Sequence, residues 1–345
     1  MKGLFKTAEG FGNLEIRETP DPRPSHGEVV IEVKAAGICG SDLHIYHWDT
    51  KLPLNPPVII GHELSGIVVE IGEGVTGWEI GERVTVEPSA YVCGRCLYCR
   101  TGFYNLCPER RVMGFWFNGA FARYVVAPAI RLHRLPENVD FHEGALTEPL
   151  ACSVHGVAEL TDISVGDLVV VSGPGTIGLF SAQIARAHGG RVVVIGTGVD
   201  EERLKKADEL GATHTINLEK CDPVAFVRDL TDGLGADVVL ECSGSQAAVE
   251  MGLELVRKKG KYTQIGLFGR SIQVDFEKIA YKEIKVTGSL AQRWTAWKKA
   301  LQLMAQEIVR TKPLISDVYP LSEWEKAFAR FAKKKGLKIL LEPGL

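Results

Sequence analysis

A thiolate, an imidazole and a carboxylate in the first half of the chain are of the types that hold a metal ion. They are Cys39, His62 and Glu148. A catalytic zinc takes three protein ligands of these kinds and keeps one position open for water or substrate. Cys152 lies one helical turn after Glu148 and is a rival for the third position. Cysteine is also common as a small residue of the core, so Cys152 need not be a ligand. At this point only the residue types support either Glu148 or Cys152 as the third ligand.

Polar side chains close to Cys39 could move a proton and orient a ligand. Ser41 stands two residues after Cys39, near enough to meet a bound alcohol, and His44 could carry a proton to solvent. Asp42 could accept the free ring N–H of a ligand imidazole, which fixes the orientation of the ring. The alternative is a polar loop whose histidines are simply solvated.

The spacing Cys93-x-x-Cys96-x-x-Cys99-x7-Cys107 predicts a second metal site of a different kind. Four thiolates at this spacing fit a closed, tetrahedral structural zinc. A closed site has no open position, so it would hold a lobe in shape and perform no chemistry. The chain has 8 cysteines in 345 residues, and their bunching indicates metal rather than a disulfide scaffold.

The second half of the chain opens on a nucleotide-binding pattern. A continuous apolar strand from Val169 runs into Gly173-Pro174-Gly175-Thr176-Ile177-Gly178, and a helix over 179–188 and a strand over 192–195 follow. The glycines let a helix N-terminus approach a pyrophosphate, where free N–H groups and the helix dipole favour negative charge. Between a strand and a helix, this spacing predicts dinucleotide binding.

The surrounding elements predict two domains of different architecture. Glycines at turn spacing between β-branched runs, such as Val29–Ala35, predict a β-barrel in the first half. Alternating helices and strands in the second half predict a doubly wound parallel sheet with helices on both faces. In that half we expect helices over 201–210, 223–230 and 246–256 and strands over 215–217, 237–242, 261–266 and 285–288. Elsewhere we expect strands over 119–126 and 338–341, a helix from 143 through His155, and helices over 297–308 and 323–334.

The composition is that of an ordinary globular protein, with 45% hydrophobic residues, 24% charged residues and a net charge of −3. This balance gives no electrostatic footprint for nucleic acid. No run of 18 apolar residues is present, and the N-terminus has no apolar segment typical of a signal peptide. We therefore expect a cytoplasmic protein with no membrane segment and a small-molecule substrate.

The run Gly61-His62-Glu63-x-x-Gly66, with Gly72 and Val75 after it, resembles the zinc signature of the medium-chain dehydrogenase/reductase family. The resemblance to its zinc alcohol and polyol dehydrogenases covers essentially the whole chain. It implies a GroES-like β-barrel catalytic domain over 1–151 and 290–345 and a Rossmann domain over 152–289. It also implies two zinc ions per chain, one catalytic and one structural, NAD as cofactor, and a homotetramer or homodimer.

The resemblance also assigns roles to residues. Glu148 stands in a Thr-Glu-Pro-Leu context as in sorbitol dehydrogenases, which favours it over Cys152 as the third zinc ligand. Glu63 would be the acidic residue beside the metal. Ser41 would take the alcohol proton and pass it through the cofactor ribose toward His44. The expected cofactor contacts are Gly173, Gly175, Ile177, Gly178, Gly196, Arg203, Gly266, Leu267 and Leu290.

The sequence departs from the family pattern where NAD-specific enzymes place an aspartate for the ribose hydroxyls. We align Gly196 with that aspartate, so discrimination against a 2′-phosphate should weaken. However, Asp200, Glu201 and Glu202 bring negative charge to the same turn, which would oppose a phosphate. We predict NAD and leave NADP open.

The substrate is predicted as a polyol, oxidised at a secondary alcohol to the ketone. The run His44–Asp49 instead resembles L-threonine 3-dehydrogenase, and butanediol dehydrogenase is a third alternative. The sorbitol family's substrate arginine aligns with Ala291, although Arg293 is nearby. A non-catalytic nucleotide-binding relative is a remote alternative, because fold does not fix function.

Overall fold

The computed structural model describes residues 1–344, and the chain divides into two compact units. The first unit contains Met1–Glu148, Arg293–Ala305 and the segment from Thr311 onward. The second contains Pro149–Gln292 and Gln306–Arg310. Our domain limits at 151 and 290 differ from these by a few residues and remain a prediction. No helix in the described part of the chain is long and apolar enough to cross a membrane.

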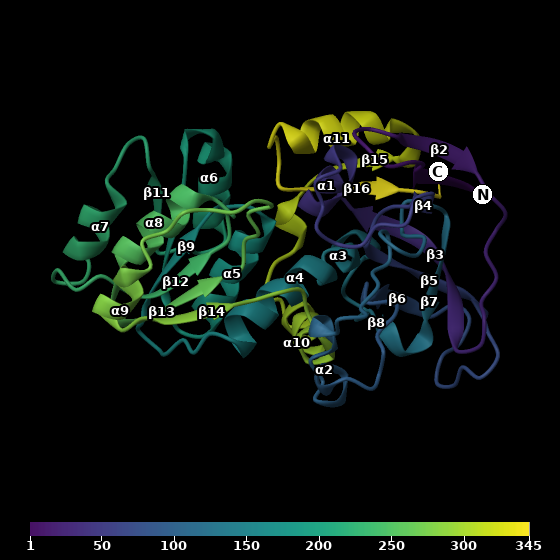
Figure 1. The fold of residues 1–345 in the computed structure, drawn as a ribbon, viewed down its shortest axis with the longest axis horizontal. Helices are drawn as coiled ribbons and strands as arrows, with labels where there is room; N and C mark the ends of the chain where they lie inside the picture. The colour runs from purple at the N-terminus through teal and green to yellow at the C-terminus, as the bar shows by residue number, and fades with distance from the viewer. Residues whose placement is uncertain (345) are drawn as a thin grey trace. The chain divides into compact units, whose positions relative to one another are not determined.

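The first unit is built on a seven-stranded sheet in which β3 (Glu28–Gly37) is central (Figure 1). β3 pairs antiparallel with β5 (Glu63–Ile71), β7 (Tyr124–Pro128) and β16 (Lys338–Glu342). The outer strands are β6 (Arg83–Val86), β8 (Leu132–Arg134) and β15 (Ile315–Pro320). A second, three-stranded sheet contains β1 (Lys2–Lys6), β2 (Leu14–Glu18) and β4 (Val58–Ile59).

The core of the first unit explains why β3 and β5 lie so close. Ile31, Leu64 and Val68 are fully buried in one apolar cluster. A Cβ added at Gly66 would lie 2.2 Å from the backbone oxygen of Glu32, so only glycine fits this strand contact. Helices of this unit are α1 (Gly40–His47), α2 (Leu97–Arg100), α3 (Phe141–Ala145), α10 (Trp294–Ala305) and α11 (Trp324–Ala332), and α4 (Thr147–Val154) begins in it.

The second unit is a six-stranded parallel sheet in the order β11-β10-β9-β12-β13-β14. The order reverses between β9 and β12, as in a doubly wound nucleotide-binding sheet, and this confirms the predicted architecture. The strands are β9 (Leu168–Ser172), β10 (Arg191–Gly196), β11 (His214–Asn217), β12 (Ala236–Glu241), β13 (Val256–Gln264) and β14 (Lys285–Gly288). The helices are α5 (Thr176–Ala187), α6 (Glu201–Glu209), α7 (Pro223–Asp229), α8 (Gln246–Leu255) and α9 (Glu277–Lys282) (Figure 1).

Several predicted elements have different limits. The helix expected over 297–308 ends at Ala305, because Glu307 adopts a left-handed φ of 56°. The strand expected over 119–126 begins only at Tyr124, because N–H groups of residues 119–121 bond to the carbonyl groups of residues 59–61, at and just after the end of β4. The helix expected from 143 through His155 is divided into α3, α4 and a π-helical turn over His155–Glu159.

Candidate active site and cysteine lobe

Strand pairing in the first unit brings together three groups that can bind a metal. Gly37, at the end of β3, pairs with Glu63, at the start of β5. Cys39 follows β3 as the N-cap of α1, and His62 directly precedes β5. One ligand atom from each of Cys39, His62 and Glu63 lies within 4.8 Å of the other two. His62 and Glu63 are buried, so a cation here would be largely shielded from water.

The pair of His62 and Asp42 has the form of an oriented ligand imidazole. Asp42 is fully buried, accepts the N–H of Cys39 at 2.8 Å, and has its pKa raised by burial to about 6. The Nδ1 of His62 lies 3.7 Å from Oδ1 of Asp42, and neither buried atom has a hydrogen-bond partner among the described residues. Burial opposes charge on the His62 ring, but Cys39, Asp42 and Glu148 outweigh it and raise its pKa to about 10. The pocket therefore favours positive charge beside Cys39, which fits a bound metal cation.

The Glu63 carboxylate is held by a lysine that we did not predict. Lys338, the first residue of β16, places Nζ 2.6 and 2.8 Å from the two Glu63 oxygens and 3.0 Å from the carbonyl oxygen of Ile38. Burial by itself lowers the Lys338 pKa, but the Glu63 carboxylate and Cys39 reverse this and raise it. The signal in the sequence is a single charged residue at the start of the apolar run Lys338–Leu341.

The predicted third ligand lies close to the cluster but outside it. Glu148 is buried near the start of α4, and its charge contributes to the raised pKa of His62. The group of mutually close ligand atoms contains Glu63 and includes neither Glu148 nor the rival Cys152. The choice of Glu148 as a ligand therefore remains a prediction.

Ser41 and His44 lie three residues apart on α1, so their side chains share one face of the helix. The Oγ of Ser41 is buried and has no hydrogen-bond partner among the described residues. His44 is half-exposed, and its Nδ1 lies 2.8 Å from an Asp49 oxygen. A buried hydroxyl and a solvent-reaching imidazole on one face are suitable ends for a proton path.

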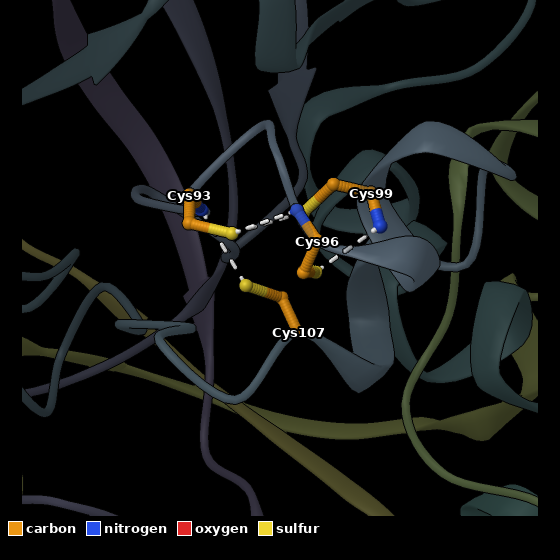
Figure 2. Close-up of side chains that lie close together, drawn as sticks. All are labelled: Cys93, Cys96, Cys99 and Cys107. Carbon is orange, nitrogen blue, oxygen red and sulfur yellow. Dashed lines mark hydrogen bonds between the residues drawn. The ribbon is translucent and has the colours of Figure 1, made fainter.

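Figure 2 shows that the side chains of Cys93, Cys96, Cys99 and Cys107 converge on one point in the first unit. Their ligand atoms all lie within 4.8 Å of one another, and none of the four forms a disulfide. Backbone N–H groups donate to the sulfurs of Cys93, Cys96 and Cys107 at 3.4 Å. The N–H of Cys96 is the main cause that lowers the Cys93 pKa to about 7, whereas burial raises that of Cys99 to about 12. This donor set fits a closed four-sulfur zinc.

The glycine pattern of the second unit is explained by close backbone contacts. Gly173 follows β9 with φ 97°, and an added Cβ would lie 2.7 Å from Cβ of Ser243. A Cβ at Gly178 would lie 1.9 Å from the backbone oxygen of Gly173. Gly175 is the N-cap of α5, and Ile177 lies in its first turn. The remaining predicted cofactor contacts, Gly196, Arg203, Gly266, Leu267 and Leu290, end or follow β10, β13 and β14, at the carboxyl edge where such sheets bind ligands.

A buried carboxylate at the same edge was also not predicted. Glu241 ends β12 and is fully buried. It accepts the N–H of Ser243 at 2.8 Å and the side-chain amide of Gln264 at 2.5 Å. Glu241 thus fixes the turn that packs against Gly173. A glutamate at the end of an apolar strand is its only signal in the sequence.

Comparisons with known proteins agree with both units. The alcohol dehydrogenase GroES-like domain matches residues 25–137, which confirms the predicted barrel, and the zinc-binding dehydrogenase model matches residues 176–306. A sorbitol dehydrogenase of Halalkalibacterium halodurans is 48% identical over 99% of both chains. A D-arabitol-phosphate dehydrogenase of Enterococcus avium is 38% identical over 99% of this chain and 97% of its own. A zinc-binding dehydrogenase of Sinorhizobium meliloti bound to NADP has a TM-score of 0.91, 32% identity and 99% coverage of both chains.

Proposed function

Because the chain belongs to the zinc-binding alcohol dehydrogenase family, we propose that it oxidises a secondary hydroxyl of a polyol to the ketone and uses NAD. It is an NAD(P)-dependent alcohol dehydrogenase. The choice of a polyol is supported by the sorbitol dehydrogenase relative, which is 48% identical across 99% of this chain.

The observation that carries the proposal is the buried cluster around Cys39. Cys39 and His62 would hold the catalytic zinc, with Glu148 as third ligand and Glu63 beside it. Zinc bound there acts as a Lewis acid that lowers the pKa of the substrate hydroxyl. The protein's own part is to orient and shield: Asp42, with Oδ1 3.7 Å from the His62 Nδ1, would orient the ring, and Lys338 holds the Glu63 carboxylate.

The proton route uses two residues on one face of α1, Ser41 and His44. The buried Ser41 hydroxyl has no protein partner in the described structure, so it is able to accept the alcohol proton while its own proton would pass through the cofactor ribose toward His44. His44 is half-exposed and would return that proton to solvent. The four cysteines of the lobe would bind a second, structural zinc and take no part in the reaction.

The test is NADH formation by zinc-loaded protein with sorbitol, xylitol, L-threonine and 2,3-butanediol in parallel, each repeated with NADP. We expect turnover with a polyol and NAD. Turnover with L-threonine or butanediol alone would refute the polyol assignment. No turnover with any of these alcohols would refute the proposal that the protein oxidises a secondary alcohol. Two zinc ions per chain are expected by elemental analysis, and Cys39→Ser should lose activity and one zinc only.

We also propose, from the family resemblance, that the protein is a cytoplasmic homotetramer or homodimer. Size-exclusion chromatography with light scattering measures the assembly directly, and a monomeric mass would contradict this proposal.

A further inference from the structure

The turn after β10 has no room for a carboxylate at the position that we aligned with the ribose-binding aspartate. Gly196 is buried at the end of β10. A Cβ there would lie 2.9 Å from the Pro174 ring and 3.0 Å from Cβ of Asp200. A longer side chain at Gly196 would therefore displace the glycine-rich turn itself.

A carboxylate from the turn after β11 fills the next available position. A Cβ added at Gly198 would lie 2.2 and 2.4 Å from the two carboxylate oxygens of Glu219. The Gly198 N–H donates to one of these oxygens at 3.1 Å. Glu219 thus occupies the space in which a side chain of residue 198 would otherwise stand.

The backbone around Glu219 fixes the carboxylate in this place. The N–H of Leu218 donates to the Gly196 carbonyl at 2.9 Å, which ties the end of β11 to the end of β10. The N–H of Glu219 donates to the side-chain oxygen of Asn217 at 2.9 Å. Glu219 therefore stands in a short turn whose backbone is tied to the ends of β10 and β11.

The other acidic groups of the turn already have partners. Asp200 accepts from the N–H and hydroxyl of Thr197 at 3.1 and 2.8 Å and pairs with Arg203 at 3.4 Å. Glu201 pairs with Lys220 at 3.0 Å, and Glu202 pairs with Lys205 at 2.7 Å. Within residues 1–344, Glu219 forms no ion pair, and its side chain is exposed.

We propose that Glu219 determines the cofactor specificity of this chain. Its carboxylate accepts a hydrogen bond from the adenosine ribose of NAD and repels the 2′-phosphate of NADP. The role is the one that an aspartate at the end of the second strand fills in NAD-binding sheets, supplied here from the turn after the third strand, β11. This inference rests on the proposed function, since it concerns the same dinucleotide site.

The test measures binding and needs no substrate. Dissociation constants of NADH and NADPH are obtained by fluorescence titration of the zinc-loaded protein, and 5′-AMP and 2′,5′-ADP are then used as competitors. We expect the unchanged protein to prefer NADH, because the Glu219 carboxylate repels the 2′-phosphate of NADPH. Glu219→Gln should reduce the ratio of the NADPH to the NADH dissociation constant by about tenfold or more.

The matched control is Glu202→Gln, which removes one negative charge from the same turn at an exposed position. It should change the ratio by less than about twofold, because the Glu202 charge is already paired with Lys205, whereas the Glu219 carboxylate is held against the turn by the Gly198 N–H. A ratio unchanged by Glu219→Gln, an equal shift in the control, or a preference of the unchanged protein for NADPH would each overturn the inference. Absence of binding of both dinucleotides would overturn the proposed function instead, and this inference with it.

Discussion

Replacing Lys338 by methionine should destabilise the first unit strongly. Both members of the Lys338–Glu63 pair are buried, with exposed fractions of 2% and 0%. Lys338 Nζ lies 2.6 and 2.8 Å from the two carboxylate oxygens. Without the lysine, the buried Glu63 carboxylate loses the ammonium group that pairs with both of its oxygens, and breaking such a pair costs about 3–5 kcal/mol.

The pH dependence of this contribution follows from the direction of the shift. Burial alone would lower the Lys338 pKa, but Glu63 and Cys39 outweigh it, so the folded pKa lies above the ordinary value. The stabilisation is therefore complete below the unfolded lysine pKa of about 10.4 and is lost as pH rises through the higher folded pKa. The cost of Lys338→Met should be the same at pH 7 and at pH 9.

The assay is urea denaturation at fixed protein and zinc concentrations, which gives the free energy of unfolding. Lys335→Met is the control, because Lys335 is exposed only three residues earlier, and it should change stability by less than about 0.5 kcal/mol. Adding Glu63→Gln to Lys338→Met should recover much of the loss, since the lost lysine then leaves no unpaired carboxylate at position 63. If Lys338→Met costs no more than Lys335→Met, the argument from buried charge is wrong.

Three further outcomes are expected. Ser41→Ala should lower turnover by about a hundredfold with normal zinc content, and an unchanged rate would contradict the proton route. Cys107→Ser should lose one zinc per chain by elemental analysis but keep the metal at Cys39; loss of both or of neither would contradict two separate sites. Burial raises the pKa of Cys242 to about 12, so its thiol stays protonated as pH rises from 7 to 10. Iodoacetamide should therefore label Cys242 slowly throughout this range, as peptide mass spectrometry would show, and rapid labelling of Cys242 at pH 10 would contradict the raised pKa.

Local patterns predicted the fold because each element carries its own signal. The continuous apolar strand before Gly173 and the alternation that follows it predicted the parallel sheet of the second unit. The limits were less accurate, because they depend on single residues. The left-handed φ of Glu307, for example, ends α10 and has no distinct mark in the sequence.

The site was predictable only where residue types and spacing suffice. The structure brings together Cys39 and His62, and separately the four cysteines of the lobe. The pairing of Lys338 with Glu63 spans 275 residues, so it depends on the register of β16 against β3. In the sequence, Glu219 likewise looks like any solvated acidic residue. Only the structure shows that its carboxylate lies beside Gly198.

The position of β16 has a consequence for synthesis on the ribosome. β16 pairs with β3 through Leu340 and Gly37, and the whole parallel sheet is encoded between these two strands. The nascent chain therefore completes the second unit while the Ala36–Gly37 end of β3 still lacks its partner. Closure of such distant pairs is slow, and an unpaired strand edge invites misassembly in the meantime. Synthesis of the first unit starts before the second unit and ends after it. The unpaired end of β3 therefore needs protection until β16 is synthesised and Lys338 can pair with Glu63.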